Sequence, residues 1–153
     1  MRRIRVYVDT SVFGGTQDEG FAEPCRRFFE RVRAGDYTIL VSRITYAELL
    51  GAPDGIRSLL AELPRRAVEE VAIGAEVAAL ADAYLAARAL PPSMRNDALH
   101  VAAATVAGAD VILSWNFRHI VNFERIRRFN GVNLLNGYHQ VSIHSPLEMD
   151  YDR

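Results

Sequence analysis

Four short polar stretches of this sequence carry oxygen-bearing side chains that could bind a metal ion or transfer protons. Asp9-Thr10-Ser11 follows a β-rich run, and Ser114-Trp115-Asn116 follows a second apolar run. Glu48 and Asp97 lie near the starts of two expected helices. If these positions converge, three carboxylates and an amide face one pocket. Such an oxygen-rich set suits Mg²⁺ or Mn²⁺, whereas zinc favours histidine and cysteine ligands.

Each of these residues also has an ordinary structural explanation. Asp9 fits an Asx turn at the end of a strand. Thr45 and Glu48 match a capping box, in which the glutamate bonds back to the helix start. Asp97 follows a good N-cap residue and gains from the helix dipole, and Asn116 fits a plain turn. These explanations are favoured for each residue taken alone, but the joint order of the four stretches favours a shared site.

The elements that must position these residues alternate between strands and helices. Strands are expected at 4–8, 37–41 and 111–113, with an edge strand at 141–143. Apolar spacing predicts helices at 23–33, 45–50, 56–63, 77–84, 99–106 and 122–135. Gly14 and Gly15 are expected to break the chain after the first strand. This alternation predicts an α/β fold with a mostly parallel sheet, in which ligands gather at the carboxyl ends of the strands.

Composition limits the class of protein. The 153 residues predict a single domain, and the net charge of −1 gives no general attraction to nucleic acid. All 18 basic residues are arginine, which suits phosphate contacts but equally follows from a GC-rich genome. The single cysteine, Cys25, fits a reducing cytosol. The longest apolar run, 101–107, is far shorter than the roughly 20 residues of a membrane span, so we expect a cytoplasmic protein.

Four stretches, in this order, resemble the pattern of the PIN-domain family. They are Val8-Asp9-Thr10-Ser11, Ile44-Thr45-Tyr46-Ala47-Glu48-Leu49, Asn96-Asp97-Ala98-Leu99-His100-Val101-Ala102 and Ala109-Asp110-Val111-Ile112-Leu113-Ser114-Trp115-Asn116. PIN domains are metal-dependent nucleases, and many are the toxins of VapBC-type toxin–antitoxin pairs. The resemblance covers about residues 4–123 of the expected domain 1–153, with a helix and strand extension at 124–153. It implies a three-layer α/β/α sandwich.

The resemblance also implies a set of site residues. Asp9, Glu48 and Asp97 match the family's metal-holding acids. The family's fourth acid follows a Ser or Thr by two residues, and here Ser114 takes the hydroxyl position while Asn116 replaces the acid. The site therefore has three carboxylates instead of four, and a second metal ion is not implied. The implied catalytic and metal-binding set is Asp9, Glu48, Asp97 and Asn116 with Mg²⁺ or Mn²⁺, and Thr10 and Ser114 would orient a water or a phosphate.

The implied function is hydrolysis of an RNA phosphodiester bond by a metal-activated water. The protein would be the toxin of a pair, neutralised by an antitoxin protein. We also expect a homodimer formed through apolar helix faces of the N-terminal half. Because Asn116 replaces an acid, an alternative is a catalytically weak or inactive PIN-like module with an RNA-binding or regulatory role. A nuclease acting on DNA would use the same acids.

A few other side chains have two open interpretations. His100 shares a helix face with Asp97, and a hydrogen-bonded structural histidine is favoured over a proton-transfer group. Trp115 is expected to pack rather than to stack on a base. An arginine cluster after the last motif could contact RNA phosphates or an acidic partner, or form a solvated helix face. It consists of Arg118, Arg125, Arg127 and Arg128.

Overall fold

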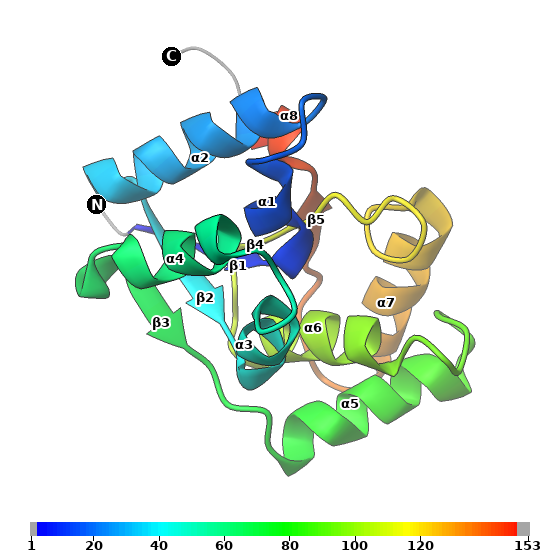
Figure 1. The fold of residues 1–153 in the computed structure, drawn as a ribbon. Coiled ribbons are helices and arrows are strands. Elements are labelled where there is room, and N and C mark those ends of the chain that lie inside the picture. Colours follow the sequence, from blue (N-terminus) through cyan, green and yellow to red (C-terminus); the bar gives the residue numbers. More distant parts are fainter. Residues whose placement is uncertain (1–2, 150–153) are drawn as a thin grey trace.

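The computed structural model describes residues 3–149, which form one five-stranded sheet with helices on both faces. The strand order is β3-β2-β1-β4-β5 and every described pair is parallel, as the α/β prediction required. The strands are β1 (Ile4–Val8), β2 (Tyr37–Val41), β3 (Val68–Glu70), β4 (Val111–Leu113) and β5 (Ser142–His144). Because β1 is the central strand, the residue that follows it lies at the middle of the carboxyl edge (Figure 1).

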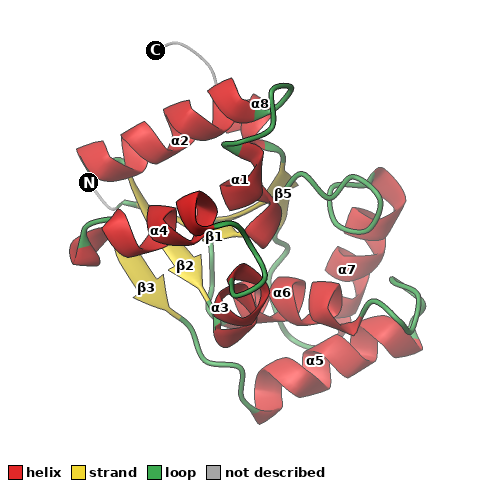
Figure 2. Cartoon of the chain, viewed as in Figure 1, coloured by secondary structure: helices red, strands yellow, loops and turns green. Residues whose placement is uncertain are grey.

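Two helical layers cover the sheet, so the expected three-layer sandwich is confirmed (Figure 2). The helices are α1 (Thr10–Gly15), α2 (Ala22–Ala34), α3 (Arg43–Leu49), α4 (Asp54–Glu62), α5 (Ala75–Ala86), α6 (Arg95–Val106), α7 (Phe123–Leu135) and α8 (Pro146–Met149), with a 3-10 turn at Arg65–Ala67. Helices α1, α2 and α4 share one core with one face of the sheet. Helices α5, α6 and α7 share another core with the opposite face.

The central strand shows how the sequence divides between these two cores. Val6 and Val8 belong to the core of α1, α2 and α4, whereas Tyr7 belongs to the core of α5, α6 and α7. All three side chains are completely buried. A strand covered on both faces is expected to be a continuous apolar run, which is what the sequence shows.

The structure departs from the expected elements in the segment after β1. Gly14 and Gly15 do not break the chain there, because both lie inside α1. A Cβ atom at Gly15 would lie 2.7 Å from Cys25 Sγ and from Trp115 Nε1. Glycine at this position therefore lets α1 approach α2 and the segment after β4 closely.

The edges of the sheet also differ from expectation. Strand β3 was not expected from the sequence, and the last strand spans 142–144 instead of 141–143. Within the described residues, no helix is long and apolar enough to cross a membrane. The last four residues of the expected extension, 150–153, lie outside the described part of the chain.

Candidate active site

Neighbouring parallel strands bring the first and last polar stretches together. Val8 at the end of β1 pairs with Leu113 at the end of β4, so Asp9 and Ser114 emerge side by side. The Asp9 amide donates to the Leu113 carbonyl at 2.9 Å. Helix α3 begins directly after β2 and carries Glu48, and α6 carries Asp97 in its first turn.

Asp9 is held by two hydroxyl groups. Ser11 Oγ and Ser114 Oγ donate to its Oδ2 atom at 2.7 and 2.8 Å. The residue is only 6% exposed, and its Oδ1 atom lies 3.7 Å from His100 Nε2. Oδ1 accepts no hydrogen bond from the residues that the structure describes. One carboxylate oxygen is thus fixed, while the other remains available to a ligand.

Glu48 turns away from its own helix start and toward Asp9. Its Oε1 atom accepts a hydrogen bond from Thr10 Oγ1 at 2.7 Å and lies 2.6 Å from His100 Nε2. Burial would raise the pKa of Glu48, but the hydrogen bond and charge of His100 and the Thr10 hydrogen bond outweigh burial and lower the pKa. Glu48 is therefore a carboxylate at neutral pH.

The capping-box interpretation of Glu48 is wrong. The N-cap of α3 is Ser42, and its backbone N–H donates to Thr45 Oγ1 at 3.1 Å. Thr45 therefore satisfies the helix start, which frees the Glu48 side chain for tertiary contacts. The residue before Asp97, Asn96, is also not an N-cap, because α6 begins at Arg95 and its N-cap is Met94; Asp97 does lie in the first turn.

His100 joins the two carboxylates. It is completely buried, and its Nδ1 atom lies 2.7 Å from the Tyr7 hydroxyl, which lies 2.9 Å from Ser42 Oγ. Burial alone would lower the pKa of His100, but the hydrogen bond to Glu48 and the negative charges of Asp9, Glu48 and Asp97 raise it overall. The expectation of a hydrogen-bonded histidine holds, yet this histidine lies within the acidic site and not merely beside it.

Asp97 and Asn116 form a second pair at the same edge. Asn116 Nδ2 donates to Asp97 Oδ2 at 3.2 Å, and His119 Nδ1 lies 3.4 Å from the same oxygen. Burial and the charge of Asp9 raise the pKa of Asp97, despite the opposing effects of His100, His119 and Asn116. Asn116 Oδ1 accepts the backbone N–H of His119 at 3.0 Å. The amide nitrogen of Asn116, and not its oxygen, therefore faces the carboxylates.

The chemistry of these side chains fits a divalent cation. Asp9, Glu48 and His100 each offer one ligand atom, and the three atoms lie within 4.8 Å of one another. Asp9 Oδ1 and Glu48 Oε2 have no hydrogen-bond donor among the described residues. Two acidic oxygens in a mostly buried site, with a third carboxylate close enough to interact electrostatically, are hard donors of the kind that Mg²⁺ or Mn²⁺ prefers.

Contacts in the structure thus connect all the predicted site residues. Thr10 and Ser114, however, contact carboxylates here, whereas a water or a phosphate was expected as their partner. The hydroxyls of Thr10 and Ser114 donate to Glu48 and Asp9, so in this structure they orient carboxylates. Their expected contact with a water or phosphate stays a prediction, as does metal binding by Asn116. The contact of His119 with Asp97 could not be predicted from the sequence spacing. It depends on a local turn, in which the His119 backbone N–H donates to Asn116 Oδ1.

Comparisons with known proteins point to one family. The family model described as PIN domain matches residues 6–126. A comparison with curated protein sequences gave no significant match.

Several solved structures share the fold at low sequence identity. VapBC2 from Rickettsia felis, bound to a DNA fragment from its promoter, is 16% identical with a TM-score of 0.62, covering 93% of this chain and 98% of that chain. VapC20 from Mycobacterium tuberculosis, described as a Sarcin-Ricin loop cleaving toxin, is 18% identical with a TM-score of 0.54, covering 89% and 98%. FitAB bound to the IR36 DNA fragment is 15% identical with a TM-score of 0.56, covering 97% and 99%.

Proposed function

Because this chain belongs to the PIN-domain family, we propose that it is a metal-dependent endoribonuclease and the toxin of a toxin–antitoxin pair. The observation that carries the proposal is the pair of free acidic oxygens on Asp9 and Glu48, with Asp97 beside them at the carboxyl edge of the sheet. Neither oxygen is among the buried atoms without a partner in the described residues, so both can be reached by a cation or a water from solvent.

The mechanism follows from the placement of the side chains. Asp9, Glu48 and Asp97 would hold Mg²⁺ or Mn²⁺. A bound divalent cation lowers the pKa of a water and offsets negative charge on a phosphate in the transition state. Ser11 and Ser114 fix one oxygen of Asp9, which aims the other oxygen into the site.

The remaining side chains hold the acids in place, and they lower the pKa of Glu48. Thr10 and His100 both bond Glu48 Oε1, which leaves Oε2 without a donor among the described residues. The Tyr7 hydroxyl, whose pKa burial raises to about 12, stays protonated and fixes the His100 ring. Asn116 donates to Asp97 and so stabilises that carboxylate. No histidine or cysteine nucleophile is needed for this hydrolysis.

Cleavage of RNA by the purified protein tests this proposal. We expect labelled RNA to be cut with Mn²⁺ or Mg²⁺ and to remain intact with EDTA. Asp9→Asn should reduce the rate by at least about 100-fold while preserving the circular dichroism spectrum, because it removes a charge that the cation needs. Asp54→Asn is the matched control, because that carboxylate lies in α4 with 91% of its side chain exposed. Cleavage that persists in both EDTA and Asp9→Asn would contradict the proposal.

One observation favours a second candidate function. The site holds an asparagine whose oxygen already accepts the His119 backbone N–H, which fits a PIN-like module that binds RNA without cutting it. The same experiment separates the two functions, because such a module would bind the RNA at micromolar protein and leave it intact at every metal concentration.

The partners are part of the proposal. We expect growth arrest when the chain is expressed alone in cytoplasm, and recovery when a short neighbouring reading frame is expressed with it. Failure of every neighbouring frame to restore growth would contradict an antitoxin partner. We also expect a homodimer, whose contact would use the groove of about 540 Å³ between α3 and α4, where Tyr46 and Leu50 are exposed. Light scattering that gives a monomer at micromolar protein would contradict the dimer.

A further inference from the structure

We propose that residues 117–128, together with Arg88, form a track that binds single-stranded RNA beside the carboxylate site. This inference rests on the proposed function, since it assigns the surface that guides the RNA to that same site. We call this surface the Phe/Arg track. Its members are Arg88, Phe117, Arg118, Phe123, Arg125, Arg127 and Arg128.

The Phe/Arg track begins at the acidic site itself. Asn116 and His119 both contact Asp97, so the loop that closes the site also carries Phe117 and Arg118 between those two residues. Two hollows continue from there along residues 85–97. The first, of about 260 Å³, is lined by residues 93–97 and includes Asp97. The second, of about 510 Å³, is lined by Leu85, Ala86, Arg88, Leu90, Pro91, Pro92 and Arg125.

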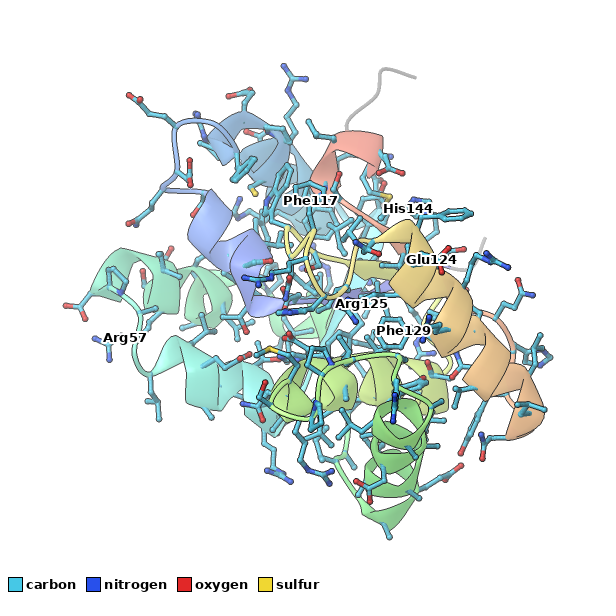
Figure 3. All side chains as sticks on the ribbon, turned by 90° about the vertical axis from the view of Figure 1, so that its right-hand side faces the viewer. Arg57, Phe117, Glu124, Arg125, Phe129 and His144 are labelled. Atoms are coloured by element: carbon cyan, nitrogen blue, oxygen red, sulfur yellow. The ribbon has the colours of Figure 1, made fainter. Side chains whose placement is uncertain are left out.

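Two arginines of this surface, Arg125 and Arg128, donate to backbone carbonyls and not to carboxylates. Arg125 donates from Nε to the Arg118 carbonyl at 3.0 Å and from Nη1 to the Ala89 carbonyl at 2.9 Å. Figure 3 shows Arg125 reaching inward from α7. Arg128 donates to the Arg88 carbonyl at 3.4 Å.

This arrangement leaves positive charge that no acidic side chain offsets. Within the described residues Arg88, Arg118, Arg125 and Arg128 form no ion pair. Arg127 differs, because it pairs with Glu124 at 3.4 Å. Guanidinium groups whose charge is not neutralised within the protein are suited to phosphates.

Exposed aromatic rings alternate with these arginines. Phe117 is 47% exposed and Phe123 is 74% exposed. Phe117 contacts Trp115 in a T-shaped arrangement, with ring centroids 6.0 Å apart, which helps to fix the position of the Phe117 ring. The Arg127 guanidinium lies over one face of Phe123, 5.7 Å from the ring centroid, so Phe117 and the other face of Phe123 remain as stacking surfaces for bases. Aromatic rings and positive charges of this kind bind single strands without sequence preference. An acidic protein partner with apolar side chains would fit the same surface, and the antitoxin outcome of the test below distinguishes it from RNA.

Arg88 has a backbone conformation that makes it a useful position for testing the track. It follows the end of α5 with φ of +60°, and it is the one residue other than glycine with positive φ among residues 3–149. The chain places glycine in this conformation at Gly35, Gly108 and Gly137, which follow the ends of α2, α6 and α7. Glycine is favoured there because a Cβ atom is strained. Replacing Arg88 by glycine therefore removes its charge at a position where the backbone conformation favours glycine.

Binding of RNA in EDTA tests the track without cleavage. The probe is a fluorescent single-stranded RNA of about 20 nucleotides, followed by anisotropy across salt concentrations. We expect Arg88→Gly and Phe117→Ala each to raise Kd about tenfold, since one phosphate contact or one stacked base is lost. Arg88→Gly should also reduce the salt slope by about 0.7 and leave Tm equal to the parent's or higher.

Two matched controls lie elsewhere on the surface. Arg65→Gln removes an exposed arginine beside the opposite edge strand, β3, and Leu135→Ala removes an 88% exposed apolar side chain at the end of α7. Both should keep the parent's Kd. In cleavage assays with Mn²⁺, the two track variants should raise KM and leave kcat close to the parent's value, because they do not touch the carboxylates.

The outcomes separate this inference from the proposed function. If the parent cleaves RNA but the track variants keep its Kd and KM, or the controls lose as much affinity, the track is overturned and the nuclease stands. If the variants bind RNA normally and instead lose an acidic antitoxin, the track is likewise overturned. If the parent binds RNA through Arg88 and Phe117 but cuts none at any metal concentration, the track stands and the nuclease does not.

Discussion

Replacing Asn116 by aspartate should turn an attractive contact into a repulsive one. Asn116 Nδ2 lies 3.2 Å from Asp97 Oδ2 and donates a hydrogen bond to a charged group, which contributes about 1.5–3 kcal/mol. Aspartate has nearly the same shape, so the variant changes charge with little effect on packing. Without a cation, two carboxylates would then share this part of the site, with Asp9 nearby.

The expected effect can be worked out from this distance. Two like charges about 4 Å apart repel by about 4 kcal/mol at an effective dielectric constant of 20. Protonating one carboxyl relieves the repulsion, but raising a pKa from about 4 to 7 also costs about 4 kcal/mol. In EDTA at pH 7 the free energy of unfolding of Asn116→Asp should therefore fall by about 4 kcal/mol. For a chain of this length that corresponds to a Tm lower by roughly 10 °C.

The pH dependence of this loss follows from the raised pKa of the new carboxyl pair. The folded variant binds a proton more readily than the unfolded chain, so the destabilisation is fully present above the folded pKa. It disappears as the pH falls toward the unfolded value near about 4, because a protonated carboxyl donates to its neighbour.

Thermal melts in EDTA and in Mn²⁺ measure these effects, with Asn116→Ala as the control that removes the hydrogen bond without adding charge. In EDTA we expect the parent to have the highest Tm, Asn116→Ala a lower Tm, and Asn116→Asp the lowest. Saturating Mn²⁺ should raise the Tm of Asn116→Asp more than that of the parent, and half-maximal RNA cleavage should need less Mn²⁺. If Asn116→Asp melts like Asn116→Ala in EDTA and keeps the parent's Mn²⁺ curve, residue 116 lies outside the metal site.

Two further predictions concern packing around α1. Gly15→Ala should lower the free energy of unfolding by about 1–3 kcal/mol, because the new Cβ meets Cys25 and Trp115, whereas Gly14→Ala, with no atom within 4 Å, should raise it by up to about 1 kcal/mol. Equal Tm shifts for the two variants would contradict this packing. Burial raises the pKa of the Cys25 thiol to about 11, and the Trp115 indole donates to its sulfur at 3.0 Å, so at pH 8 a disulfide reagent should react only after denaturant is added. Rapid reaction of the folded protein would show that the thiol is accessible.

The central strands could be predicted from the sequence because their physical requirement is local. Strands β1, β2 and β4 are short apolar runs buried on both faces, and the polar residues that end them mark the carboxyl edge. The edge strand β3 could not be predicted, because Val68–Glu70 is short and two of its residues are glutamates. Its identity as a strand depends on pairing with β2, which is a long-range contact.

The candidate site shows the same division between local and long-range information. A Thr-x-x-Glu pattern is the same whether the glutamate side chain caps its own helix or points away to make tertiary contacts. Here Thr10 and His100, from distant segments, bond Glu48 and hold it in the site. His100 could be placed on the face of Asp97 from helical spacing, but its contact with Tyr7 required the sheet. The orientation of the Asn116 amide follows from a turn that spacing alone does not specify.

The strand order also sets when the site can exist during synthesis. Strand β1 is made first, but its pairing with β4 joins residues 105 positions apart, such as Val6 and Val111. Pairings over such a separation form late, because the chain must first close a long loop. A nascent chain carrying Asp9 and Glu48 still lacks Asp97 and the Ser114 hydroxyl that fixes Asp9. Under the proposed function, a nascent chain would therefore gain nuclease activity only after the residues through Ser114 have been synthesised.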